Sequence, residues 1–322
     1  MKADKLSNIY RKSKNAEHQT QWSALDPIDL DRPFMPENRT QLYFTDVYWR
    51  LSDRQRLRYN QLFACRVNEY IMVLESDMVE YFLVPLLQHQ KVRENSDLHL
   101  CLEVMIEEER RHYQMFLDLN RRCFPSIYSG SKEKHFTEFP LMARNLFPLL
   151  RLAGQKLPFP IWYIMAMEEE AIDLAKAMLK CPNTETLGEL EPNFVAIHRE
   201  HMKDEARHVA IDLHVSENCF DGRALQRKVG AWFFKLTMKA MTYVGSKGPG
   251  AKVIYSLIEE FPELLDIKNE LFTALVSLNG NSNYQKSLFN RSSAPNSFQM
   301  FDEIPEFDDL GKVLVGYDRQ IP

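Results

Sequence analysis

Apolar residues recur every three to four positions along most of this chain, which predicts a protein built from α-helices. No segment keeps the alternation of apolar and polar residues that marks a half-buried β-strand. Proline, glycine or polar clusters separate the predicted helices, and Pro85 is expected to bend the last turns of the first one. The predicted helices cover residues 52–88, 96–123, 138–152, 158–179, 191–218 and 221–243, with two more within 251–278. A cap at Ser52 and another at Ser96 are expected to begin the first two.

The two ends of the chain lack this periodicity. Residues 1–38 are polar and contain three prolines, so we expect an extended arm on the surface. Residues 279–322 are rich in Asn, Ser and Asp and are expected to be mostly irregular. The sequence therefore predicts a single helical domain over 1–322, in which residues 52–278 form the bundle.

Composition narrows the class of protein. A chain of 322 residues with 45% hydrophobic residues can bury a sizeable core, and a formal net charge of −5 does not indicate nucleic-acid binding. Five scattered Cys without a Cys-x-x-Cys pair indicate reduced thiols in a cytoplasmic protein. The polar residues 1–20 do not resemble a secretory signal, and Lys235 and Lys239 interrupt the most apolar run, which argues against a membrane span.

The strongest chemical signal lies in the helix predicted over 191–218. His201, Glu205 and His208 are four and three residues apart, so an α-helix turns all three to one face. Two imidazoles beside a carboxylate form a ligand set for a transition-metal ion. A second Glu-x-x-His turn, 109–112, lies in another predicted helix. Two such turns are typical of a four-helix bundle that holds two metal ions, although exposed ion pairs at this spacing are the alternative.

The remaining ligands must be carboxylates, because two divalent ions bring four positive charges into an apolar bundle. In a helical hairpin, residues equally far from the turn face each other. Glu75 and Glu109 lie equally far from a turn centred near residue 92. Apolar residues surround Glu75 on its own helix, so its carboxylate is expected to point inwards, with a surface position as the alternative.

The fourth carboxylate lies in the run Glu168-Glu169-Glu170, where the register is open. Counting from a turn near Leu187 places Glu169 opposite Glu205, whereas Glu168 has the more apolar neighbours. We predict Glu169, with Glu168 as the alternative. Outside the ligand set, His198 is expected to be packed or to support the ligands, and Asp204 either to orient a ligand imidazole or to be solvated.

These residues resemble the p-aminobenzoate N-oxygenase family of ferritin-like di-iron oxygenases. An extra His one turn before the last Glu-x-x-His is that family's mark, and His201 has this position here. The runs around Glu75 and after Glu169 are also similar, and the resemblance covers roughly residues 55–245. The metal ligands that it implies are Glu75, Glu109, His112, Glu169, His201, Glu205 and His208.

The resemblance implies a ferritin-like four-helix bundle with flanking helices that binds two iron ions and uses O2 as co-substrate. A peroxo-diferric species would transfer oxygen to an amine inside an apolar shell that protects the oxidant. Electrons would come from an external donor, because the sequence has no flavin or nicotinamide fingerprint. A homodimer is also expected from the resemblance, whereas the charge and the interrupted apolar run predict neither a nucleic-acid nor a membrane partner.

One departure from the family concerns the substrate. The family's first-ligand helix carries a Tyr and an Arg that hold the aminobenzoate carboxylate, and the matching positions here are Val67 and Tyr70. We therefore expect an amine other than p-aminobenzoate, either free or tethered to a carrier protein. Val67, Tyr70, Met72 and Met165 are candidates for the substrate pocket, although methionines at helical spacing are more often core residues.

Three alternatives remain at this point. A radical-generating subunit like that of ribonucleotide reductase would need a Tyr four residues after the first ligand His, where this chain has Phe116. A di-iron C–H hydroxylase or desaturase would use the same ligands. A non-catalytic iron-binding or structural helical protein is the third alternative.

Overall fold

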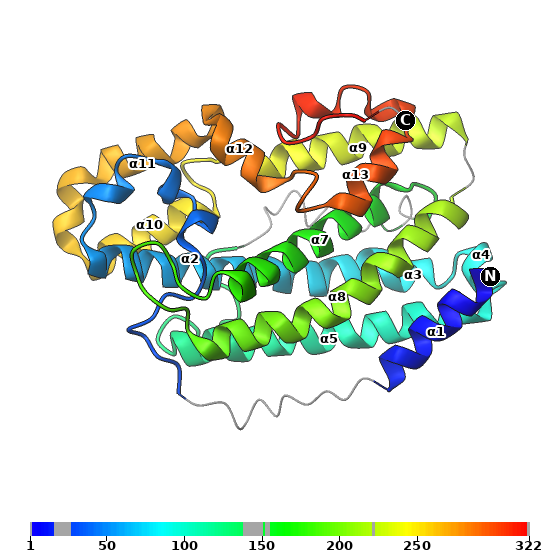
Figure 1. The fold of residues 1–322 in the computed structure, drawn as a ribbon, viewed down its shortest axis with the longest axis horizontal. Coiled ribbons are helices and arrows are strands. Elements are labelled where there is room, and N and C mark those ends of the chain that lie inside the picture. Colours follow the sequence, from blue (N-terminus) through cyan, green and yellow to red (C-terminus); the bar gives the residue numbers. More distant parts are fainter. Residues whose placement is uncertain (1, 16–26, 138–150, 152–154, 221–222, 321–322) are drawn as a thin grey trace.

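The computed structural model describes residues 2–15, 27–137, 151, 155–220 and 223–320. These residues are organised as helices and the turns and loops that join them (Figure 1). The β-type pairing found among them is confined to two isolated bridges, one between residues 183 and 189 and one between 290 and 316. The prediction of an all-helical fold is confirmed.

Four long helical segments run side by side in the centre (Figure 1). The first is α2 (Asp53–Val73), which continues into a π-helical stretch (Leu74–Leu83) and then α3 (Val84–Leu86). The short α4 (Gln90–Arg93) leads to the second segment, α5 (Ser96–Cys123). The third and fourth are α7 (Phe159–Lys180) and α8 (Pro192–Asn218), which pack along each other, while α5 contacts both α2 and α8.

Polar side chains fix where these helices begin. Ser52 and Gln55 form a capping box at the start of α2, in which each side chain accepts a hydrogen bond from the other's backbone N–H. Asn95 caps α5 by accepting from the N–H of Leu98, one residue earlier than the predicted cap at Ser96. Glu191 caps α8 in the same way. The predicted bounds of the bundle helices otherwise agree closely with the structure.

The π-helical stretch was not predicted, because apolar spacing does not distinguish it from an α-helix. Its backbone hydrogen bonds span one more residue per turn, and such stretches often occur at functional sites. Glu75 lies in its first turn. The wider turn therefore helps to set the direction in which this carboxylate projects.

Both predictions for the chain ends are wrong in part. The predicted extended arm begins with a helix, α1 (Lys2–Lys14), whose Leu6 is buried and whose Ser13 accepts a hydrogen bond from Arg207 of α8. The predicted irregular tail contains α12 (Ser282–Leu288) and α13 (Pro295–Asp302). These short helices are stabilised by packing against the bundle, which a search of the sequence for long amphipathic periods does not detect.

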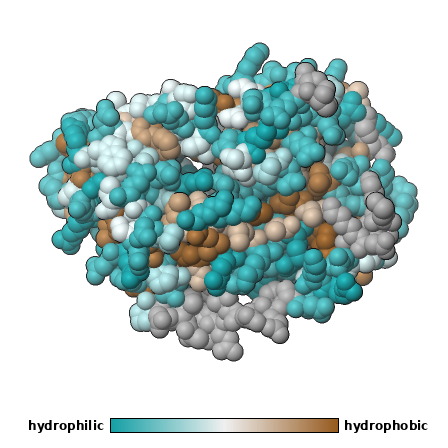
Figure 2. All heavy atoms as spheres, viewed as in Figure 1, coloured by the Kyte–Doolittle hydropathy of each residue, from teal (hydrophilic) through white to brown (hydrophobic). Residues whose placement is uncertain are grey.

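Further helices cover the bundle. The helix α9 (Ala224–Thr242) packs on α7, and α10 (Pro249–Glu260) packs on α2 with α11 (Lys268–Ser277) behind it. The surface in Figure 2 is mostly polar, with apolar side chains gathered in the middle of this face. None of the helices in the described ranges is long and apolar enough to cross a membrane. The helix predicted over 138–152 lies outside the described residues except at position 151.

Candidate metal centre

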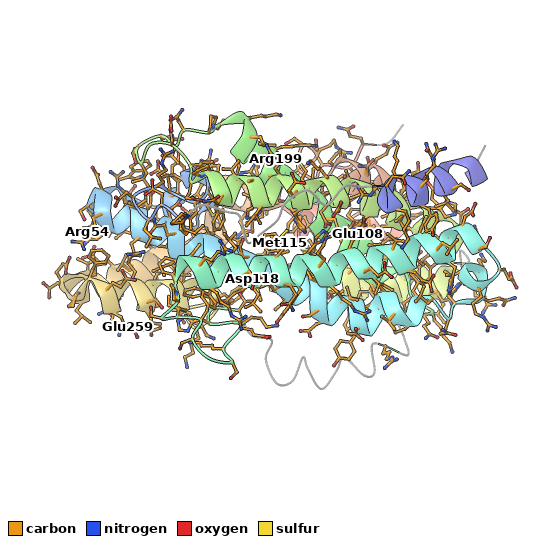
Figure 3. All side chains as sticks on the ribbon, turned by 90° about the horizontal axis from the view of Figure 1, so that it is seen from below. Arg54, Glu108, Met115, Asp118, Arg199 and Glu259 are labelled. Atoms are coloured by element: carbon orange, nitrogen blue, oxygen red, sulfur yellow. The ribbon has the colours of Figure 1, made fainter. Side chains whose placement is uncertain are left out.

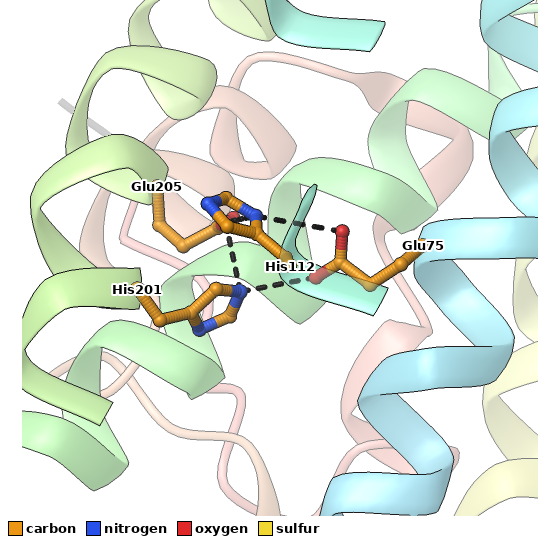
Figure 4. A group of neighbouring side chains, drawn as sticks. All are labelled: Glu75, His112, His201 and Glu205. Atoms are coloured by element: carbon orange, nitrogen blue, oxygen red, sulfur yellow. Dashed lines mark hydrogen bonds and ion pairs between the residues drawn. The ribbon is translucent and has the colours of Figure 1, made fainter. Parts of the chain in front are cut away.

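Four buried side chains from three helical segments meet inside the bundle (Figure 4). Glu75 comes from the π-helical stretch, His112 from α5, and His201 and Glu205 from α8. The Nε2 atom of His201 lies 3.0 Å from Glu75 Oε1 and 2.9 Å from Glu205 Oε1. The Nδ1 atom of His112 lies 3.6 Å from Glu75 Oε2 and 3.4 Å from Glu205 Oε1. We call these four residues the first metal group.

A second metal group adjoins the first. It consists of Glu109 from α5, Glu168 from α7, and Glu205 and His208 from α8, all of them buried. The Nδ1 atom of His208 lies 3.1 Å from Glu109 Oε1 and 3.5 Å from Glu205 Oε1. In each group, one ligand atom per residue lies within 4.8 Å of all the others. Because Glu205 belongs to both groups, the arrangement suits two neighbouring ions that share a carboxylate.

Several polar atoms of the two metal groups are buried without a hydrogen-bond partner, which is unusual in a protein interior. Leaving one buried polar atom unpaired costs about 1–3 kcal/mol, and most native structures avoid it. Metal ions would satisfy these atoms, and the four carboxylates of the two groups would balance two divalent ions. The unpaired atoms are His112 Nδ1, His208 Nδ1, Glu75 Oε2, Glu205 Oε1 and both carboxylate oxygens of Glu168.

Two further carboxylates hold the outer nitrogens of the imidazoles. His112 Nε2 lies 3.0 Å from Asp204 Oδ2, and His208 Nε2 lies 2.9 Å from Glu108 Oε2. Figure 3 shows Glu108 between α5 and α8. An imidazole that donates its Nε2–H to a carboxylate keeps the lone pair of Nδ1 free for a metal ion. Both rings are therefore held in the tautomer and orientation that ligation requires.

One arginine connects the two supporting carboxylates. Arg207 donates to Glu108 Oε1 at 2.7 Å and also to Asp204, which accepts a second arginine hydrogen bond from Arg111. Burial by itself would raise the pKa of Asp204, but the hydrogen bond from His112 and the charges of Arg207 and Arg111 hold it below its usual range. Asp204 thus remains an anion that can orient its imidazole.

The repeated motif is longer than the predicted Glu-x-x-His echo. In both copies, at 108–112 and 204–208, the order is acid, Glu, any residue, Arg, His. The first acid of each copy holds the His of the other copy. The sequence contained this signal, and it would have identified Glu108 as well as Asp204.

The structure corrects the prediction within the Glu run, because Glu168 and not Glu169 reaches the second metal group. The carboxylate of Glu169 points to α13 and accepts hydrogen bonds from the backbone N–H groups of Asn296 and Ser297 at 2.9 and 2.8 Å. The mirror count failed because the connection between Lys180 and Pro192 is too long and irregular for its midpoint to fix the register to within one residue. A one-residue error in register turns a side chain by about 100°.

The four residues predicted to line a substrate pocket differ in their burial and contacts. Met72 and Met165 are fully buried, and Val67 is half-buried against the core. The Tyr70 hydroxyl forms a hydrogen bond with that of Tyr163 and lies 3.2 Å from Met167 Sδ. These contacts bring Tyr70 against α7, one residue from the ligand candidate at 168.

Two aromatic contacts complete the surroundings of the first metal group. The rings of Phe116 and His201 meet edge to face with centroids 4.9 Å apart, which covers the imidazole with an apolar side chain. His198 is packed: its Nε2 lies 3.1 Å from Asn68 Oδ1, and its ring stacks on Phe194. Burial lowers the pKa of His198 to about 3, so this ring is neutral.

A helical bundle that surrounds two adjoining groups of buried carboxylates and imidazoles defines the class of ferritin-like di-iron carboxylate proteins. Within this class, the family model described as P-aminobenzoate N-oxygenase AurF matches residues 3–257, and the chain therefore belongs to the AurF family. Members of this family are N-oxygenases that use a di-iron centre with O2. The resemblance inferred from the motifs is confirmed, and the match begins nearer the N-terminus than expected. No curated protein matches the chain.

Proposed function

We propose that this di-iron N-oxygenase acts on an amine other than p-aminobenzoate. The observation that carries the proposal is the pair of buried metal groups that share Glu205, in a chain that belongs to the AurF family. The residues proposed to bind the two irons are Glu75, Glu109, His112, Glu168, His201, Glu205 and His208.

When bound, the two irons supply the activation of O2. The protein's own contribution is to hold the ligands in place before the metals arrive. Asp204 and Glu108 fix two imidazoles, and Arg207 fixes these carboxylates relative to each other. The Phe116 ring covers the imidazole of His201 and so helps to exclude water from this region.

The substrate proposal rests on the surroundings of Tyr70, at the position where the resembling family has a carboxylate-binding Arg. Burial and the neighbouring Tyr163 raise the pKa of Tyr70, so its phenol is neutral and already engaged. Arg66 lies four residues before Tyr70 and so does not occupy the position of the family's Arg. Tyr70 itself supplies no cation for a substrate carboxylate.

The proposal is tested by loading the protein with ferrous iron under anaerobic conditions, adding a reductant and O2, and supplying a panel of amines. We expect O2 consumption that depends on the amine, with hydroxylamine, nitroso or nitro products detected by mass spectrometry. The panel should compare p-aminobenzoate with its uncharged esters and with aliphatic amines. Rapid turnover of p-aminobenzoate alone would contradict the substrate proposal.

The same experiment distinguishes the alternatives. Products hydroxylated or desaturated at carbon would indicate a C–H oxidising enzyme with the same ligands. O2 consumption that is independent of every amine would favour a non-catalytic iron protein. A radical subunit is disfavoured because Phe116, which lies against His201, cannot form a phenoxyl radical. We also propose that an external donor supplies the electrons and that the enzyme forms a homodimer.

A further inference from the structure

The outer face of α9 carries a strip of exposed apolar side chains, which we call the α9 strip. Four of the five most exposed large apolar side chains in the described part of the chain lie on α9 or directly after it. At separations of seven, four and seven residues, they follow one line along the helix. Contiguous exposed apolar surface commonly marks an interaction site. The strip consists of Leu225, Trp232, Leu236 and Tyr243, with exposed fractions of 74%, 57%, 50% and 66%.

Basic residues flank the α9 strip. Residues 223–243 include five Lys or Arg and no Asp or Glu. Arg227 and Lys235 are paired with acidic residues of the C-terminal segment. Lys228 and Lys239 are exposed and form no salt bridge with any residue that the structure describes. Their helical spacing sets both of them beside the strip. A partner that complements this face is therefore acidic around an apolar centre.

The inner side of α9 contacts residues that lead to the metal centre. The Sδ atom of Met241 on α9 lies 3.3 Å from the hydroxyl oxygen of Tyr70, and the Sδ atom of Met167 on α7 lies 3.2 Å from the same oxygen. Met167 directly precedes Glu168, a proposed ligand of the second metal group. Met241 lies two residues before Tyr243 of the strip. A short series of contacts thus connects the α9 strip with a proposed ligand, as electron transfer from a docked donor requires.

We propose that the α9 strip is the docking surface for an acidic one-electron donor protein. The inference rests on the proposed function, which needs an external source of electrons. Each donor that docks is oxidised by one electron, so two successive encounters reduce the iron pair by two electrons. Electron-transfer complexes typically have small interfaces, in which opposite charges speed the encounter. One exposed helix face with unpaired lysines suits an interface of this kind.

A second copy of this chain fits the α9 strip less well. A two-fold interface pairs a surface with itself. An axis that crosses the middle of α9 would bring Lys228 of each copy towards Lys239 of the other, because these lysines lie on either side of that point. Like charges oppose such a contact. The proposed homodimer is therefore expected to form through another surface.

The first test measures binding of an oxidised, acidic [2Fe–2S] ferredoxin to the iron-loaded protein by isothermal titration calorimetry, with the basic protein cytochrome c for comparison. Lys239→Glu is compared with Lys12→Glu, the same change of charge at an exposed position of α1, which packs on α5 and α8 (Figure 1). We expect Lys239→Glu to weaken ferredoxin binding at least about fivefold, and Lys12→Glu less than about twofold. Added salt should weaken binding to the unsubstituted protein.

Leu236→Ser tests the apolar part of the surface. This variant keeps every charge and alters an exposed side chain, so its melting temperature should not change, whereas ferredoxin binding should weaken about fivefold. Stopped-flow reduction of the iron-loaded protein by reduced ferredoxin should slow in both Leu236→Ser and Lys239→Glu. Reduction by dithionite, a small reductant that needs no docking surface, should be unchanged. This comparison separates a loss of docking from damage to the metal centre.

Equal ferredoxin binding by Lys239→Glu and Lys12→Glu, or no preference of the unsubstituted protein for ferredoxin over cytochrome c, would overturn the inference. A change from dimer to monomer in Leu236→Ser, measured by analytical ultracentrifugation, would assign the strip to a second copy instead. Either result leaves the proposed function standing if the dithionite-reduced protein oxidises an amine with O2. Conversely, a protein that binds ferredoxin through the α9 strip but oxidises no amine would contradict the proposed function and leave the docking surface intact.

Discussion

The two halves of the metal centre are constructed differently. The α5–α8 half contributes two Glu-x-x-His turns. The Nε2 atoms of their imidazoles are hydrogen-bonded to Asp204 and Glu108. The other half contributes Glu75 from the π-helical stretch that follows α2 and Glu168 from α7, and each has at least one buried oxygen that lacks a hydrogen-bond partner. In the first half the Nε2 atoms of two imidazoles are held by carboxylates of the protein, whereas in the second half both oxygens of Glu168 lack a protein partner. Ligand changes should therefore act differently from changes in the supporting network.

The largest effect is expected from removing the carboxylate that both metal groups share. Glu205→Ala removes a ligand from both metal groups, so iron binding at both positions should be lost. Iron content after anaerobic loading and desalting measures this. By comparison, His208→Ala should retain the first iron, because His208 belongs to the second group alone. If Glu205→Ala kept both irons, the shared-carboxylate arrangement would be wrong.

The next largest effect is expected to distinguish two adjacent residues, Glu168 and Glu169. Glu168→Gln should lose most of the iron at the second position, because Glu168 is proposed as a ligand there. Glu169→Gln should retain both irons but lower the free energy of unfolding by about 0.5–2 kcal/mol, since it weakens the cap of α13. Iron content and urea unfolding of the two variants measure this pair. If Glu169→Gln lost iron and Glu168→Gln did not, Glu169 would be the ligand, as the sequence predicted.

A smaller loss is expected from the supporting network. Asp204→Asn replaces the anion that orients His112, and such changes typically lower metal affinity by about 10–100-fold without abolishing binding. Competition with a metal chelator measures the affinity. Arg207→Gln should have a similar but weaker effect, because it acts on His112 and His208 only through Asp204 and Glu108. An effect as large as that of Glu205→Ala would show that Asp204 binds metal directly.

The smallest effect concerns pH. The pKa of His198 is lowered by burial from 6.5 to about 3 in the folded state, so protonation favours the unfolded chain. The contribution of His198 to the free energy of unfolding should therefore decrease by about 1.4 kcal/mol for each pH unit as the pH falls from 6.5 towards 3. His198→Gln should lose less stability than the unsubstituted protein between pH 6.5 and 5. Urea unfolding at these two pH values tests this, and parallel losses in both proteins would contradict it.

Sequence patterns predicted most of the bundle and most of the site. The helices that carry Glu109, His112, His201, Glu205 and His208 were expected with nearly correct bounds, because their spacing is a local property of helix geometry. Glu75 was placed correctly by counting from a turn, whereas the same count failed at Glu169. The count depends on the length and shape of the turn, and a sequence does not state these.

Local periodicity by itself determined that this chain is helical and that α5 and α8 each present a Glu-x-x-His turn, since residues three and four apart share a helix face whatever surrounds them. Only the tertiary structure decided that Glu168 belongs to the second metal group and that Glu169 caps α13. It also decided that α1 and α13 are helical. These features depend on how separate helices meet, and contacts between distant segments are set by packing and not by local spacing.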